Sequence, residues 1–98
     1  GNPLSRDKNG NTPFSISLKY KDDVIKAVLG NDITIADSDG NTPIHIIVSN
    51  NGSEEHLLNL IQSGYPIDTR NSMGYTPLAI AIKKNNIPLA KILLEKGR

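Results

Sequence analysis

Apolar residues recur along the chain at helical spacing, in short stretches that are separated by polar breaks. Residues 24–29 carry apolar side chains at i, i+1, i+4 and i+5, and residues 89–93 carry them at i, i+3 and i+4. Each of these spacings places the apolar side chains on one face of an α-helix. Along the whole chain we predict six short helices in three pairs, at about 13–20 and 23–29, 43–50 and 54–63, and 77–85 and 87–96.

The first helix of each pair follows the same polar motif, Gly-x-Thr-Pro and then an apolar residue. The three copies begin 30 and 34 residues apart. Glycine suits the positive φ of a tight turn, threonine suits a helix N-cap, and proline suits the first helical position, where no N–H is needed. We therefore assign a structural role to Gly10, Thr12, Pro13, Gly40, Thr42, Pro43, Gly74, Thr76 and Pro77.

The two histidines of the chain receive structural or surface roles. His45 lies three residues after Thr42, which is the spacing of a capping box with histidine in place of Glu or Gln. We expect it to hydrogen-bond Thr42 and a neighbouring turn. His56 follows Glu54 and Glu55, a cluster that could hold a metal. Adjacent residues do not converge on one helix face, however, so a surface role is favoured over metal binding.

The helix pairs are too short to bury both of their apolar faces alone, but stacked pairs can bury them. The segment 44–48, Ile-His-Ile-Ile-Val, is apolar nearly all round, which is expected of a helix enclosed by neighbours. Its β-branched residues are poor helix formers, so packing must hold it in place. The pattern therefore predicts an all-α solenoid of three helix-turn-helix units.

Composition narrows the function further. The chain has 98 residues, a net charge of +1 and no cysteine. The small charge gives no electrostatic case for binding nucleic acid or an anionic membrane, and no segment reaches the roughly 18 apolar residues of a membrane-spanning helix. No catalytic triad, phosphate loop or cysteine zinc site can be formed from the motifs present. We expect no enzyme activity, cofactor or metal, and we take a monomer and the cytoplasm as defaults.

At the repeated motifs the chain resembles the ankyrin repeat family, whose repeat of about 33 residues carries Gly-x-Thr-Pro-Leu-His-x-Ala. Residues 40–45 are close to this motif, and residues 74–81 match it with Ala79 in place of histidine. Residues 92–97 are similar to the end of the family's second helix. The resemblance covers about residues 4–98. It implies one ankyrin-repeat domain at 1–98, with repeats at about 7–36, 37–70 and 71–98, joined by tight turns or short β-hairpin fingers.

The first repeat departs from the family pattern. It is three residues short, and Ser15 and Ser17 take the histidine and alanine positions. A terminal repeat is often atypical, which favours a short complete array. Residues 1–4 echo residues 64–67, which follow the second repeat, and this favours a piece of a longer array.

The resemblance implies that a partner protein binds the turn tips and the concave surface of the first helices. Met73 and Tyr75 are apolar residues at a tip where folding requires neither, and tyrosine and arginine concentrate binding energy in interfaces. The nearby lysines favour an acidic stretch on the partner. The candidate contact residues are Arg6, Lys8, Tyr20, Asp39, Arg70, Met73, Tyr75, Lys83 and Lys84.

Two functions remain open on this basis. The chain is a non-enzymatic module that binds another protein, or it is the interaction arm of a larger enzyme or secreted effector whose chemistry lies outside this chain. Both would have the same sequence here. The identity of the partner is not encoded in any motif.

Overall fold

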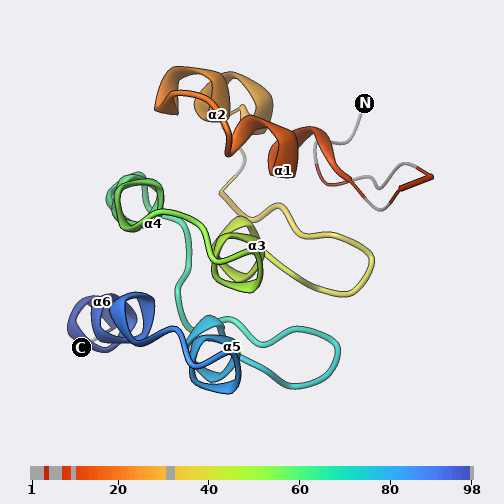
Figure 1. The fold of residues 1–98 in the computed structure, drawn as a ribbon. Coiled ribbons are helices and arrows are strands. Elements are labelled where there is room, and N and C mark those ends of the chain that lie inside the picture. Colours follow the sequence, from red (N-terminus) through yellow and green to blue (C-terminus); the bar gives the residue numbers. More distant parts are fainter. Residues whose placement is uncertain (1–3, 5–7, 10, 31–32, 98) are drawn as a thin grey trace. The chain divides into compact units, whose positions relative to one another are not determined.

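The computed structural model describes residues 4, 8–9, 11–30 and 33–97. These residues form six helices and no strand: α1 (Pro13–Ser17), α2 (Asp22–Leu29), α3 (Pro43–Ser49), α4 (Glu54–Gln62), α5 (Pro77–Lys83) and α6 (Ile87–Lys96) (Figure 1). The prediction of three helix pairs in an all-α fold is confirmed. In the described part of the chain, tight turns rather than β-hairpin strands precede the first helices. The chain divides into two compact units, Gly1–Asp32 and Ile33–Arg98, and each is described by itself.

The first unit holds α1 and α2, which pack against each other. α1 begins with a capping box in which the Ser15 N–H donates to Thr12 Oγ1 and the Thr12 N–H donates to Ser15 Oγ, both at 2.9 Å. Ser15 therefore performs the capping role that histidine has in the family motif. α1 ends at Ser17, whose hydroxyl donates to the Phe14 carbonyl oxygen. This helix is three residues shorter than predicted.

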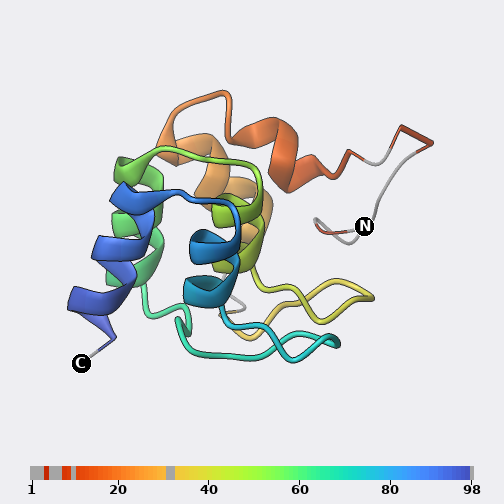
Figure 2. The same ribbon diagram turned by 60° about the horizontal axis from the view of Figure 1, so that its bottom comes forward.

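The second unit consists of two helix-turn-helix repeats, α3–α4 and α5–α6. α5 packs on α3, and α6 packs on α4, so the second pair lies against the first along both helices (Figures 1 and 2). Ile44, Ile47, Val48 and Leu57 are each 0% exposed. Burying such side chains stabilises a fold by about 1.5–3 kcal/mol each. The expectation that the apolar segment 44–48 is enclosed by packing is confirmed, because only Ile46 in it is half-buried.

Three helices of the second unit end in the same hydrogen-bonded motif. After α3, Asn51 has a φ of 54° and the Gly52 N–H donates to the Ile47 carbonyl oxygen at 2.8 Å. After α5, Asn85 has a φ of 58° and the next N–H returns to the Ala81 carbonyl oxygen. α4 ends in the same way at Gly64. This is the Schellman motif, and its left-handed residue explains why α3 and α5 stop one and two residues before the predicted ends.

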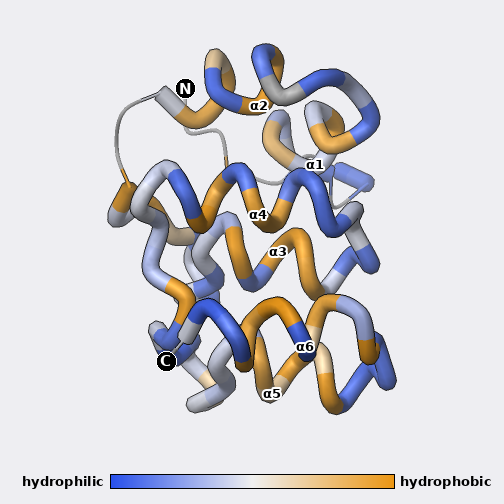
Figure 3. Tube along the Cα trace, turned by 90° about the vertical axis from the view of Figure 1, so that its left-hand side faces the viewer, coloured by the Kyte–Doolittle hydropathy of each residue, from blue (hydrophilic) through white to orange (hydrophobic). Residues whose placement is uncertain are grey.

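Apolar segments of the second unit coincide with the helices, and the connecting turns are mostly polar (Figure 3). Ser53 is the N-cap of α4, and its Oγ accepts from the His56 N–H at 3.1 Å, with Glu54 and Glu55 in the first turn. Both carboxylates therefore lie at the positive end of the helix dipole.

Candidate protein-interaction surface

The turn at residues 37–41, which precedes α3, is organised by the Asp37 side chain. Its Oδ1 atom accepts from the Asp39 and Asn41 N–H groups, both at 2.9 Å. The Asp37 N–H in turn donates to the Asn41 carbonyl oxygen at 3.0 Å, and Gly40 supplies a φ of 76° between them. The turn is therefore closed by its own hydrogen bonds.

The turn at residues 71–75, which precedes α5, has the same construction with asparagine in place of aspartate. Asn71 Oδ1 accepts from the N–H groups of Met73 at 2.9 Å and Tyr75 at 3.0 Å. The Asn71 N–H donates to the Tyr75 carbonyl oxygen at 2.9 Å, and Gly74 has a φ of 82°. Either side chain serves because the turn requires only one acceptor oxygen at this position.

The two turns are joined side by side, and we call them together the turn pair (Figure 2). The Ser72 N–H donates to the Asp39 carbonyl oxygen, and Asn71 Nδ2 donates to Asn41 Oδ1, both at 2.9 Å. The approach is close enough that a Cβ atom on Gly40 would lie 3.0 Å from the Ser72 nitrogen. The turn pair is thus a fixed platform rather than two independent loops.

His45 connects α3 to the second turn of this pair. The Thr42 N–H and hydroxyl donate to His45 Nδ1 at 3.1 and 2.9 Å, which assigns the proton to Nε2. Nε2 then donates to the Tyr75 carbonyl oxygen at 2.9 Å. Burial lowers the pKa of His45 from 6.5, and the hydrogen bond to Tyr75 opposes this shift only in part. The predicted structural role of His45 is confirmed, and both ring nitrogens are occupied.

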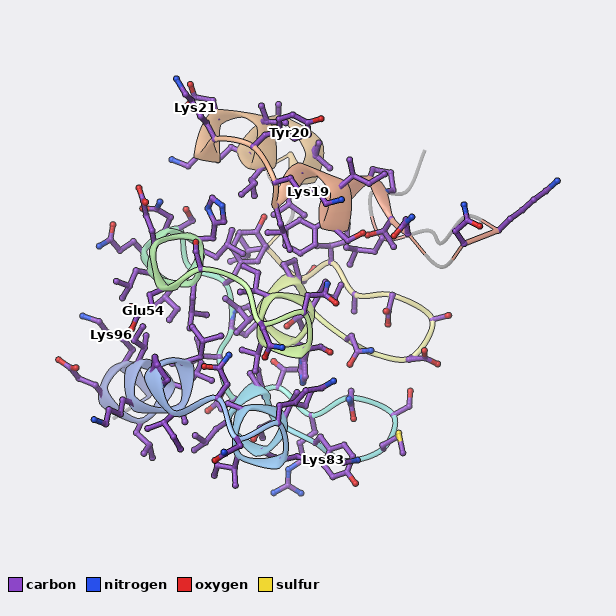
Figure 4. All side chains as sticks on the ribbon, in the orientation of Figure 1. Lys19, Tyr20, Lys21, Glu54, Lys83 and Lys96 are labelled. Carbon is purple, nitrogen blue, oxygen red and sulfur yellow. The ribbon has the colours of Figure 1, made fainter. Side chains whose placement is uncertain are left out.

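Around the turn pair, the candidate contact residues of the third repeat present an exposed mixed surface. Met73 is 74% exposed at the tip, while Tyr75 is half-buried. Lys83 Nζ lies 5.1 Å from the centroid of the Tyr75 ring, within the range of a cation–π contact. Figure 4 shows Lys83 on α5 beside this turn. Together with the exposed Arg70 and Lys84, these residues form what we call the third-repeat surface.

The other candidate contact residues are distributed as follows. Asp39 is exposed in the first turn of the pair, and its carbonyl oxygen joins that turn to the second. Tyr20 and Lys8 belong to the first unit, where Tyr20 is 59% exposed at the connection between α1 and α2 (Figure 4). Arg6 lies outside the described residues, as does Gly10 of the structural motif. Four of the nine candidates, Met73, Tyr75, Lys83 and Lys84, thus lie in the third repeat, and Arg70 directly precedes it.

Sequence reasoning missed the role of two residues that build this surface, namely Asp37 and Asn71. Their signal is an Asp or Asn located three residues before each turn glycine, a position from which a short side chain can accept from the backbone two residues on. The contact between Lys83 and Tyr75 had no signal in the sequence, because eight residues and a helix start separate them.

The described residues show neither a metal cluster nor a membrane-spanning helix. They contain no cluster of three His, Cys, Asp or Glu side chains that could hold a metal, and none of their helices has the length and apolar character needed to cross a membrane. Every buried side-chain nitrogen and oxygen in the same residues has a hydrogen-bond partner. The features available for function there are shape, exposed side chains and charge.

Comparison with known proteins places the repeats in a family. The family model for ankyrin repeats in three copies matches residues 14–98. The chain belongs to the ankyrin repeat family. The resemblance drawn from the repeated motif and the expected ankyrin-type solenoid class are thereby confirmed. Ankyrin repeats are generally protein–protein interaction modules and are typically not enzymes.

Individual relatives come from several kinds of organism. A protein named as an ankyrin repeat protein in Rickettsia felis is 38% identical over 68 residues, which is 65% of this chain and 30% of that protein. An ankyrin repeat protein of Variola virus is 34% identical over 94 residues, 92% of this chain and 16% of that protein. The acyl-CoA-binding domain-containing protein 2 of Arabidopsis thaliana is 44% identical over 46 residues, 47% of this chain and 13% of that protein. The chain spans less than a third of these relatives.

Proposed function

We propose that this chain is a non-enzymatic module that binds another protein through the turn pair and the adjoining surface of the first helices. The observation that carries the proposal is the third-repeat surface. It combines a 74% exposed methionine with a tyrosine–lysine contact and an exposed arginine, on turns closed by hydrogen bonds. Exposed apolar and aromatic groups on a fixed platform are typical of sites that bind proteins.

The turns are suited to binding because their backbone is already ordered. Asp37 and Asn71 each satisfy two N–H groups of their own turn, and the two turns satisfy each other through Ser72 and Asn41. A partner therefore does not need to order this backbone on binding. Association costs less free energy when the bound conformation exists beforehand. Only the side chains at the turn tip and on the first helix would have to change conformation when a partner binds.

The charges favour a partner with acidic residues. Arg70, Lys83 and Lys84 are exposed cations among the proposed contacts, and Asp39 is the exposed carboxylate among them. Oppositely charged surfaces increase the association rate and exclude partners of like charge. We expect the binding site on the partner to carry Asp or Glu residues around an apolar group that covers Met73.

We also infer one domain at 1–98, with repeats at about 7–36, 37–70 and 71–98.

Affinity capture from a lysate, read by mass spectrometry, tests this function. The bait is the wild-type chain beside an Arg70→Ala, Tyr75→Ala double variant and a control double variant, Lys91→Ala, Glu95→Ala, with matched melting curves. We expect a partner that wild type and control retain and that the first variant loses. Equal retention by all three proteins, or no partner, would contradict the proposed surface.

A second candidate is supported by the comparisons. The Arabidopsis relative is named for an acyl-CoA-binding domain, and the stretch that this chain matches is 13% of that protein. Its repeats thus occur in a protein that also carries another function. On this candidate, our chain is the interaction arm of a larger enzyme or secreted effector, with the chemistry outside residues 1–98. Reading the gene on both sides tests it, because a flanking segment of different composition is expected.

A further inference from the structure

Three large apolar residues of α5 and α6 are exposed. Ile82 is 62% exposed, Ile87 is 50% exposed and Leu94 is 53% exposed. Leu78 lies one turn before Ile82 on α5 and is half-buried. We call Leu78, Ile82 and Leu94 the outer face, and we leave out Ile87 because the residue of α4 that corresponds to it, Glu54, is exposed as well. In a helix pair that ends an array, the equivalent surface is usually polar, because nothing covers it.

The repeat geometry shows what this surface corresponds to in the preceding repeat. Thr42 and Thr76 cap equivalent helices 34 residues apart, and the same step relates Val48 to Ile82. Val48 is 0% exposed, whereas Ile82 is 62% exposed. Val48 lies on α3, against which α5 packs, and Ile82 lies on α5, the last of the first helices among the described residues. The difference in exposure is therefore the difference between a covered and an uncovered copy of one surface.

The second helices show the same relation. The N-caps Ser53 and Asn86 are 33 residues apart, and this step relates Ile61 of α4 to Leu94 of α6. Ile61 is half-buried in a helix that α6 packs against, while Leu94 is exposed. By contrast, Gln62 is exposed in α4, and its equivalent Glu95 is exposed in α6. Other positions do not follow this relation: Lys91, the equivalent of half-buried Leu58, is charged and exposed, and Ile87 is exposed like its equivalent Glu54.

We propose that the outer face is a stacking surface for a fourth ankyrin repeat of the same polypeptide, which packs on α5–α6 as α5–α6 packs on α3–α4. The argument is the continuity of this surface with the interface already present between the two repeats. Exposed apolar patches of this kind mark contact sites, and the neighbouring repeat supplies the shape of the occupant. The outer face shares no residue with the third-repeat surface, but Tyr75 of that surface occupies the position at which Asn41 joins the second repeat to the third, so a fourth repeat would lie beside it.

The hydrogen bonds that link the second repeat to the third could form only in part between the third repeat and a fourth. The equivalents of Asn41 and His45, which join the second and third repeats, are Tyr75 and Ala79. Ala79 has no polar side-chain atom, and Tyr75 carries its hydroxyl at the far end of a ring rather than at the place of the Asn41 amide. The Met73 carbonyl oxygen remains at the position of the Asp39 acceptor. The stacking of a fourth repeat would therefore rest mainly on the outer face, which makes Ile82 and Leu94 the residues to change.

The test extends the chain after Gly97 by a second copy of residues 65–97, since Gly64 and Gly97 hold equivalent positions at the ends of α4 and α6. We expect the midpoint of urea denaturation to rise by about 1 M over the 98-residue chain. An Ile82→Asp, Leu94→Asp double variant removes this rise in the extended chain and leaves the midpoint of the 98-residue chain nearly unchanged. Glu95→Gln is the matched control and changes neither midpoint.

Two results would overturn the proposal. One is an extended chain whose midpoint equals that of the 98-residue chain, or a double variant that lowers both midpoints equally. The other comes from light scattering of the 98-residue chain. A dimer that the double variant dissociates would show that the outer face pairs with a second copy instead of a fourth repeat.

Discussion

His45 Nε2 donates a hydrogen bond of 2.9 Å to the carbonyl oxygen of Tyr75, thirty residues further along the chain. The ring is 0% exposed, and its other nitrogen accepts from Thr42. The buried His45 side chain thus caps the start of α3. It also holds the turn that carries the proposed contact residues of the third repeat. Ala79, at the equivalent position of the third repeat, has no such function.

Replacing His45 by alanine tests this connection. The variant leaves the Thr42 N–H and the Tyr75 carbonyl oxygen without their partner and opens a cavity. Each unsatisfied buried group costs about 1–3 kcal/mol, so we expect the free energy of unfolding to fall by about 3 kcal/mol or more. Urea denaturation measures the change, with His56→Ala as the control. Similar losses in the two variants would contradict the role assigned to His45.

The same residue predicts a pH dependence of stability. Burial lowers the pKa of folded His45 below its unfolded value of 6.5, so the unfolded chain binds a proton more readily. The contribution of neutral His45 is therefore fully present above about pH 6.5 and declines as the pH falls below it, by at most about 1.4 kcal/mol per unit. Urea midpoints from pH 7.5 to 5.0 measure this decline. It should be smaller in His45→Ala, and an identical slope would be inconsistent with the assignment.

Gly40 and Gly74 form a matched pair that tests the contact between the two turns. Both have positive φ, 76° and 82°, so alanine should cost about 1–2 kcal/mol at either position. A Cβ atom on Gly40 also meets the Ser72 nitrogen at 3.0 Å and Asn71 Cα at 3.2 Å, whereas one on Gly74 meets nothing within 4 Å. We expect Gly40→Ala to lower the free energy of unfolding by about 1 kcal/mol more than Gly74→Ala. Equal losses would mean that the turns are not tightly joined.

Asn85 is the left-handed residue that ends α5, with a φ of 58°. Alanine there should lower the free energy of unfolding by about 1–2 kcal/mol, because a Cβ atom disfavours this conformation when no local hydrogen bond compensates. Glycine should leave it unchanged or raise it, since glycine is the usual residue of the motif. Thermal and urea unfolding of the two variants provide the comparison. A stability order with alanine above glycine would contradict the observed helix end.

The sequence predicted the six helices because their signals are local. Thr-Pro starts, apolar stripes and polar breaks each act within a few residues, and the repetition of the motif reinforced them. The ends of α3 and α5 were placed one and two residues too late, because Asn51 and Asn85 adopt a left-handed conformation that asparagine only sometimes takes.

The construction of the candidate site was less predictable. The capping role of His45 followed from its spacing to Thr42, but the acceptor in the next repeat could be named only as a turn. The links between Ser72 and Asp39 and between Asn71 and Asn41 depend on how two repeats stack, which no local pattern encodes. The choice of contact residues came from the family resemblance and remains a prediction for binding experiments.

The measurement that tests the central claim most directly is the affinity of the captured partner, in purified form, for variants of the third-repeat surface. Calorimetric titration compares wild type with Met73→Ala, Tyr75→Ala and the control Lys91→Ala, all with matched melting temperatures. The account predicts that Kd rises at least about tenfold for Met73→Ala and Tyr75→Ala, which corresponds to about 1.4 kcal/mol, and is unchanged for Lys91→Ala. An unchanged Kd for both tip variants would contradict a binding surface at the third repeat.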